Sequence, residues 1–177
     1  VCSQLCAASC VQPALQPALQ PAVQPAVVGA SSSAKLEIVT DKPELWKDGD
    51  PVRPSLGVSF KTYPGRKVFG LKNEAGGYDA FCCVAKTYDV PWDIMSLSSL
   101  TAEDGTVCVP YTVWSTRRGA GKAIINALLD YVKQSKEIIH RVVTLSPKTD
   151  MARNFHLRNG AKELRVNDET QNFEYKL

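Results

Sequence analysis

One segment of the chain combines glycines with cationic side chains: residues 113–123, V-W-S-T-R-R-G-A-G-K-A. Gly119 and Gly121 allow a tight turn and a close approach of the backbone to a ligand, because no Cβ intervenes. A helical pattern follows, and its unpaired first amides would face the same place, where the helix dipole favours negative charge. With Arg118 and Lys122 beside it, the segment predicts a phosphate or pyrophosphate site. A glycine-rich turn with solvated arginines is the alternative.

Two common nucleotide-binding loops do not fit this segment. The Walker pattern requires glycine at Thr116 and a hydroxyl residue at Ala123, and without that hydroxyl a magnesium ion loses a ligand. A dinucleotide-binding GxGxxG would require glycine at Ile124. The phosphate ligand therefore belongs to another class.

The surrounding pattern changes from strands to alternating helices and strands. Apolar residues at i, i+1, i+4, i+5 and i+8 predict a helix over residues 119–135. Thr149 is a capping residue for a second helix that ends at Gly160. Pro110 predicts a bulge or an edge in the strand over residues 106–114. The expected fold class is α/β with a mixed sheet. The expected strands are residues 35–40, 67–72, 78–90, 106–114, 140–145, 161–166 and 172–177, with a helical turn at 43–47 and irregular chain at 48–66.

The first 34 residues contain no Asp, Glu, Lys or Arg and carry a four-residue Gln-Pro-Ala repeat. Proline at every fourth position opposes a helix, so we expect residues 1–34 to be a disordered tail and residues 35–177 to be the folded domain. A tether or targeting leader and an inactive remnant are both open for the tail. The overall composition, 44% hydrophobic and 22% charged, is typical of a soluble domain, and no apolar run is long enough to span a membrane.

Six cysteines are present, but their spacing does not predict a metal site. Three lie in the tail, Cys82 and Cys83 are adjacent, and Cys108 stands alone, without any CxxC pair. Adjacent residues of a strand face opposite sides, so Cys82 and Cys83 do not form one site. Free buried thiols in a reducing, cytoplasmic compartment are expected, with no metal.

Arg118, Gly121 and Ala123 form the pattern R-x-x-G-x-A, which resembles the acetyl-CoA pyrophosphate loop of the GNAT (GCN5-related N-acetyltransferase) superfamily. Residues 149–161, T-D-M-A-R-N-F-H-L-R-N-G-A, are similar to a later helix motif of that family. The resemblance covers residues 67–177 and, weakly, 35–66. It implies a GNAT-like acyl-CoA N-acyltransferase fold with a reduced N-terminal part.

The resemblance also implies where coenzyme A lies. Backbone amides of the loop would bind its pyrophosphate, the preceding strand would pair with its pantetheine arm, and Thr149 begins the second motif. The charge is compatible, because residues 117–165 hold 11 Lys or Arg against 4 Asp or Glu. The implied cofactor-binding residues are Tyr111, Thr112, Val113, Arg118, Gly119, Ala120, Gly121, Lys122, Ala123 and Thr149.

The catalytic groups depart from the family pattern. His156 stands where the family usually has a tyrosine; an imidazolium could protonate a thiolate, and a histidine satisfied by local hydrogen bonds is equally consistent. The strand over residues 106–114 lacks the carboxylate base of many members, so Glu103, just before it, is the candidate base.

The implied activity is transfer of an acetyl group from acetyl-CoA to an amine, either a small molecule or a peptide. A catalytically silent GNAT-like module, such as a phage virion component in a homo-oligomer or larger assembly, is the alternative. A nucleic-acid binder using the basic residues is weaker, because no aromatic base-stacking pattern accompanies them and the net charge is only +3.

Overall fold

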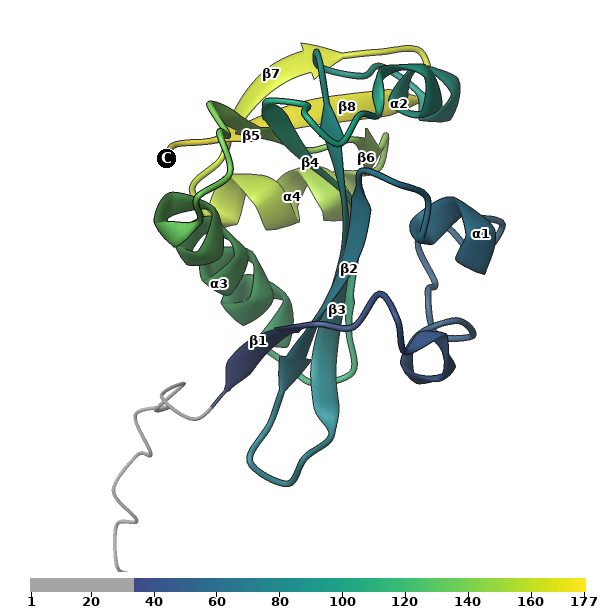
Figure 1. Ribbon diagram of the computed structural model, residues 1–177. Helices are drawn as coiled ribbons and strands as arrows, with labels where there is room; N and C mark the ends of the chain where they lie inside the picture. Colours follow the sequence, from purple (N-terminus) through teal and green to yellow (C-terminus); the bar gives the residue numbers. More distant parts are fainter. Residues whose placement is uncertain (1–33) are drawn as a thin grey trace, which may run out of the picture. The chain divides into compact units, whose positions relative to one another are not determined.

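A mixed eight-stranded sheet organises residues 34–177, the part of the chain that the computed structural model describes (Figure 1). The strand order is β1-β2-β3-β4-β5-β8-β6, and β7 pairs with β8. Only β4 and β5 run parallel, connected by a helix; the other pairs are antiparallel. The strands are β1 (Lys35–Ile38), β2 (Arg66–Lys72), β3 (Tyr78–Thr87), β4 (Val107–Ser115), β5 (Arg141–Val143), β6 (Ser146–Pro147), β7 (Lys162–Val166) and β8 (Thr170–Tyr175).

Helices cover both faces of the sheet, and each face has its own apolar core. On one face α3 (Ala120–Gln134) and α4 (Asp150–Arg158) pack against the strands, as the left side of Figure 1 shows. The opposite face is covered by the 3-10 turn η2 (Pro43–Leu45) and its neighbouring chain, α1 (Val58–Lys61) and α2 (Ile94–Leu100). The α/β class is confirmed, and so is the element order expected from residue 67 onward, apart from the two short elements α2 and β6 (Ser146–Pro147).

Local chemistry explains where α3 and α4, the two helices predicted from the sequence, begin. Thr149 caps α4, because its Oγ1 accepts the amide of Ala152 at 3.2 Å. Gly119 precedes α3 with φ of +83°, a left-handed conformation that glycine adopts without strain.

Three short elements were not expected from the sequence. The four-residue α1 lies inside the segment 48–66 that was expected to be irregular, and β6 follows the strand expected at residues 140–145. The third is α2, which lies between the strands expected at residues 78–90 and 106–114, where no element was expected. Asp93 and Ser96 form a reciprocal capping box there, which stabilises a helix too short to show a clear apolar period.

The bulge predicted at Pro110 is present in β4. Cys83 of β3 is paired with Thr112 and Val84 with Pro110, which leaves Tyr111 as the extra residue between them. The bulge turns the C-terminal half of β4, which carries the predicted pantetheine-binding residues.

The three cysteines of the described residues are free and buried, as predicted. Cys82 and Cys83 lie in the cores of opposite faces. Burial raises the pKa of the Cys108 thiol to about 12, so it stays protonated and unreactive at neutral pH.

Within residues 34–177, no helix has the length and apolar character needed to cross a membrane. The predicted tail, with Cys2, Cys6 and Cys10, falls outside the described residues apart from its last position, so its disorder stays a prediction.

Candidate functional site

The parallel strands β4 and β5 separate after a short stretch of pairing. Val107 pairs with Arg141 and Cys108 with Val142, and the amide of Leu145 donates to the carbonyl of Pro110 at 3.0 Å. Beyond this bond β4 continues along β3, whereas the chain after β5 turns to form β6 against β8. The two strands therefore leave a gap between their C-terminal ends.

A cleft of about 460 Å³ occupies this gap. One wall is the bulged part of β4, the other is β6 with α4, and Gly121 at the start of α3 closes one end. Its lining is mainly apolar, with a few polar groups, as is typical of small-molecule sites. Six residues predicted from the sequence line it together: Tyr111, Thr112, Val113, Gly121, Thr149 and His156.

The loop over residues 116–120 connects Ser115 to Gly121, which both line the cleft. The amide of Ala120 donates to the carbonyl of Arg117, and the amide of Ala123 donates to the carbonyl of Gly119, both at 3.1 Å. These two amides, predicted to face a ligand, are thus already engaged.

Four other amides of this loop remain open. Among residues 34–177, the amides of Arg118, Gly119, Gly121 and Lys122 have no hydrogen-bond acceptor. Amides exposed at the start of a helix are suited to bind an anionic oxygen. The predicted cradle therefore consists of these four donors.

Glycine is favoured at positions 119 and 121 for different physical reasons. A Cβ on Gly119 would meet no atom within 4 Å, so only its positive φ favours glycine. A Cβ on Gly121 would lie 3.1 Å from Cε2 of Phe155, which is tighter than ordinary contact. Gly121 thus lets the first turn of α3 approach α4 beside the cleft.

Cationic side chains surround the loop. Arg117 is largely exposed, with Nη1 3.7 Å from a carboxylate oxygen of Asp79. Arg118 and Lys122 are exposed, and neither has an ion-pair partner among the residues that the structure describes. The loop therefore offers two uncompensated positive charges next to its open amides.

His156 lies on α4, lines the cleft and is only 5% exposed as a residue. Its Nδ1 is 2.8 Å from the hydroxyl of Tyr175, and its ring stacks on Phe173 at a centroid distance of 5.2 Å. Burial lowers the pKa of His156 to about 4. The imidazole is therefore neutral at pH 7, which does not fit the imidazolium acid considered from the sequence.

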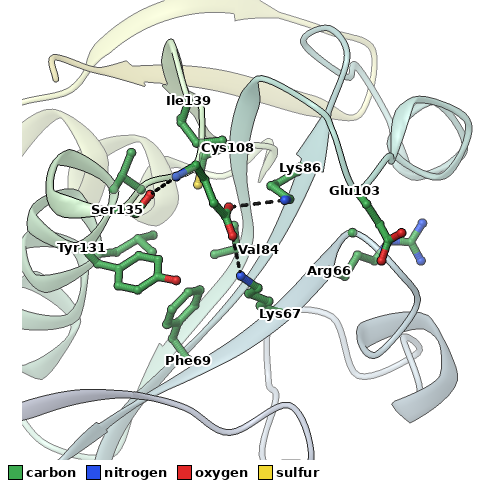
Figure 2. Close-up of a pocket in the computed structure, with 14 residues that line it drawn as sticks. Arg66, Lys67, Phe69, Val84, Lys86, Glu103, Cys108, Tyr131, Ser135 and Ile139 are labelled. Atoms are coloured by element: carbon green, nitrogen blue, oxygen red, sulfur yellow. Dashed lines mark hydrogen bonds and ion pairs between the residues drawn. The ribbon is translucent and has the colours of Figure 1, made fainter.

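Glu103 is not brought to the cleft. It lines a second cavity near the N-terminal end of β4, where it lies on the same side as Arg66 and apart from Tyr131 (Figure 2). Sequence proximity to β4 suggested a base, but Glu103 precedes the strand while the cleft adjoins its C-terminal half. The structure therefore offers no basis for a catalytic role of Glu103.

A buried polar network that the sequence did not reveal supports the cleft wall from behind. The hydroxyl of Thr112 donates to the carboxylate of Asp50 at 2.9 Å, and Nζ of Lys61 donates to the same carboxylate at 2.7 Å. Both charged side chains are almost fully buried, at 2% and 1% exposure. The Asp50-Pro51 dipeptide is typical of a turn, which was the only available signal.

Asp50 stays ionised in this network. Burial raises its pKa, but the groups around it, first among them the hydrogen bonds from Lys61 and the Arg53 amide, together lower the pKa by more. The net pKa therefore lies below the usual value. A carboxylate so well stabilised is a weak proton acceptor. Its role is to hold Thr112, whose oxygen keeps lone pairs free to accept a hydrogen bond.

Arg53 joins the two separating strands. Its Nε donates to the carbonyl of Tyr111 at 2.8 Å and its Nη2 donates to the carbonyl of Leu145 at 3.0 Å. These carbonyls belong to the two sides of the gap, just after the last direct bond between them. The planar guanidinium thus holds the strands at a defined separation.

No cluster of His, Cys, Asp or Glu within residues 34–177 is arranged to hold a metal ion.

Comparison of the sequence with protein-family models and with curated proteins gives no match. Solved structures do match. The malonyl-CoA decarboxylase of Rhodopseudomonas palustris has a TM-score of 0.64 at 16% identity, covering 82% of this chain and 60% of that one. The GNAT-like decarboxylase GphF, in complex with isobutyryl-CoA, has a TM-score of 0.62 at 12% identity, covering 80% and 98%. The Campylobacter jejuni N-acetyltransferase PseH, in complex with acetyl coenzyme A, has a TM-score of 0.54 at 11% identity, covering 81% and 98%.

These matches show the fold of the chain. The chain spans about 60% of the length of the malonyl-CoA decarboxylases it matches. It has a GNAT-like fold, as the two sequence motifs predicted, and this fold is shared by acetyltransferases and decarboxylases.

Proposed function

From the GNAT-like fold and the cleft between β4 and β5, we propose that this protein binds an acyl-CoA and transfers its acyl group to an amine, with acetyl-CoA as the donor. The observation that carries the proposal is the separation of β4 from β5 into a cleft that reaches Gly121, within the loop that has four unpaired amides. An extended pantetheine arm fits a gap between strands, and a pyrophosphate fits a helix N-terminus.

Each part of the chain would then have one task. The amides of residues 118–122, with Arg118 and Lys122, bind the pyrophosphate. The backbone of Tyr111, Thr112 and Val113 pairs with the pantetheine arm, because the bulge has turned it away from β5. Arg53 keeps the gap open through the two carbonyls that it joins.

The chemical step would depend on positioning. Holding a thioester beside an amine contributes a large part of a transfer rate by itself. The hydroxyl oxygen of Thr112 accepts a hydrogen bond from the attacking amine, since its own proton is directed at Asp50. The amine nitrogen bonds to the acyl carbon, the carbon–sulfur bond breaks, and the proton lost by the amine ends on the departing thiolate, so coenzyme A leaves as a free thiol. If the Tyr175 hydroxyl donates to Nδ1 of His156, the imidazole proton lies on Nε2 and can hydrogen-bond the departing sulfur.

Calorimetric titration with acetyl-CoA tests the binding part. Gly121→Glu introduces bulk against Phe155 and a negative charge beside the open amides, so we expect at least a tenfold weaker affinity. Asn126→Glu adds the same charge on an exposed position of α3 outside the cleft and serves as the matched control. Equal affinity of both variants and the unmodified chain would contradict the proposed site.

Release of free thiol from acetyl-CoA, with polyamines, amino acids and peptides as acceptors, tests the transfer part. Binding without release for any acceptor would favour the catalytically silent module.

The reducing, cytoplasmic compartment expected from the free cysteines is part of the same proposal, because buried thiols need no disulfide partner.

A second candidate is decarboxylation of a malonyl-type CoA. The cleft lining contains hydroxyl groups and an imidazole but no carboxylate to act as a base for an amine, within the residues that the structure describes. Decarboxylation needs no such base: a carbon–carbon bond breaks, carbon dioxide leaves and a proton is added to the remaining carbanion. Conversion of malonyl-CoA to acetyl-CoA without release of free thiol, followed by chromatography, would support this reaction over amine transfer.

A further inference from the structure

A second cavity, of about 260 Å³, opens near the N-terminal end of β4 and shares no lining residue with the cleft (Figure 2). Tyr131 of α3 forms one wall, with its ring 5.2 Å from that of Phe69. The floor is buried and apolar, so an apolar ligand body would be stabilised there. The floor residues are Phe69, Val84, Cys108, Leu128 and Val132.

Two lysines from adjacent strands meet one carboxylate over this floor. Nζ of Lys67 on β2 is 2.8 Å from Oε1 of Glu137, and Nζ of Lys86 on β3 is 3.4 Å from Oε2 (Figure 2). Glu137 lies in the connection between α3 and β5, and its side chain is 35% exposed. Two ammonium groups against one carboxylate leave one positive charge uncompensated.

The remaining charged groups of the cavity do not cancel this charge. The guanidinium of Arg66 is directed away, to the carbonyl of Phe60 and the hydroxyl of Thr101. Glu103 is exposed at the far rim beside Arg66 (Figure 2). The Lys67–Lys86 pair therefore forms a cationic end of the cavity beside its apolar floor.

Glu137 and Lys67 are both ionised in this arrangement. The hydrogen bond from Lys67 lowers the pKa of Glu137 more than burial raises it. Burial lowers the pKa of Lys67, but the hydrogen bond and charge of Glu137 and the nearby Tyr131 hydroxyl together raise it by more, so the net pKa is raised. The position between the lysines thus favours a carboxylate.

We propose that this cavity binds a small organic monocarboxylate with a compact aromatic or branched aliphatic body, whose carboxylate replaces that of Glu137 between Lys67 and Lys86. Glu137 is partly exposed and can turn into solvent, while the ligand body gains the buried floor that Glu137 does not cover. The volume lies below the range of about 300–1,000 Å³ typical of drug-sized ligands, so the ligand is small.

Titration of the full chain with benzoate, followed by backbone amide chemical shifts, tests this site. Shifts are expected at Lys86, Tyr131 and Ile139, and not at Thr112 or His156. Benzamide, which has the same ring without the charge, is expected not to bind. Inorganic phosphate, which has the charge without the ring, is expected to bind at least about tenfold more weakly than benzoate.

Three variants are expected to change the affinity for benzoate in different directions. Glu137→Gln removes the internal competitor and is expected to tighten benzoate binding about fivefold, since partly exposed ion pairs are each worth at most about 1 kcal/mol. Lys86→Met is expected to weaken it at least about tenfold. Lys133→Met, an exposed lysine of α3 that does not line the cavity, is expected to leave it unchanged.

A misfolded variant cannot bind more tightly, so the Glu137→Gln result separates a ligand site from a structural ion pair. Unchanged or weaker binding by this variant would overturn the proposal, as would the absence of shifts at Lys86 and Ile139 with millimolar benzoate. Equal binding of benzamide, or of phosphate, would overturn the assignment of a carboxylate with an apolar body.

Discussion

Acidification should destabilise this protein through His156, and the magnitude follows from its environment. The pKa of the buried imidazole is about 4, against 6.5 for an exposed histidine. Between these values the unfolded chain carries a proton that the folded chain does not, so stability falls as the pH falls. A difference of about 2.5 in pKa corresponds to about 3 kcal/mol at pH 4, and to about 2 kcal/mol at pH 5.

Urea unfolding between pH 7 and pH 4 measures this effect when two chains are compared. Carboxylates also titrate in the lower part of this range, so the unmodified protein is compared with His156→Asn. The asparagine amide can replace Nδ1 as partner of the Tyr175 hydroxyl but does not titrate. The free energy of unfolding of the unmodified chain should fall by about 2 kcal/mol more than that of the variant between pH 7 and pH 5.

Parallel curves for the two chains over this interval would refute the reasoning. That result would mean that the pKa of His156 in the folded state is close to its ordinary value of 6.5, so that an imidazolium acid would again be available to the proposed transfer. A steeper fall of the variant would also contradict a buried neutral imidazole.

Three substitutions test other parts of the structure. Asp50→Asn leaves the ammonium of Lys61 buried without a counter-ion, so unfolding by urea should show a loss of about 3–5 kcal/mol. Gly105→Ala places a Cβ 2.6 Å from the backbone nitrogen of Thr87, which cannot move aside, so a loss of about 1–3 kcal/mol or more is expected by the same measurement. Arg53→Met leaves two carbonyls of the separating strands without their donor, so calorimetry should show acetyl-CoA affinity about tenfold weaker.

Arg66→Met is the control for the last variant, because Arg66 donates hydrogen bonds away from the cleft. If both arginine variants lose acetyl-CoA affinity in proportion to their loss of stability, Arg53 has no special role at the cleft. A loss under 1 kcal/mol for Asp50→Asn would mean that the Lys61 ammonium finds water. An unchanged Gly105→Ala chain would show that the Thr87 backbone yields.

Features that depend on neighbouring residues were predictable from the sequence. The left-handed turn at Gly119 before α3, the Thr149 cap and the bulge at Pro110 each follow from the conformation or hydrogen-bonding capacity of one residue type. The apolar period of α3 and the order of elements around it predicted the fold, because both can be seen in short stretches of neighbouring residues. These features also placed the proposed phosphate loop.

Features that depend on distant residues were decided only by the tertiary structure. Arg53 reaches carbonyls 58 and 92 positions away, and Asp50 bonds a hydroxyl 62 positions away. Glu103 lies near β4 in sequence, yet at the wrong end of the strand for the cleft. No local pattern encodes such contacts, because they form only when the sheet brings separate segments together. The charge state of His156 belongs to this class, since the burial that lowers its pKa comes from β8 and α4 packing around one imidazole ring.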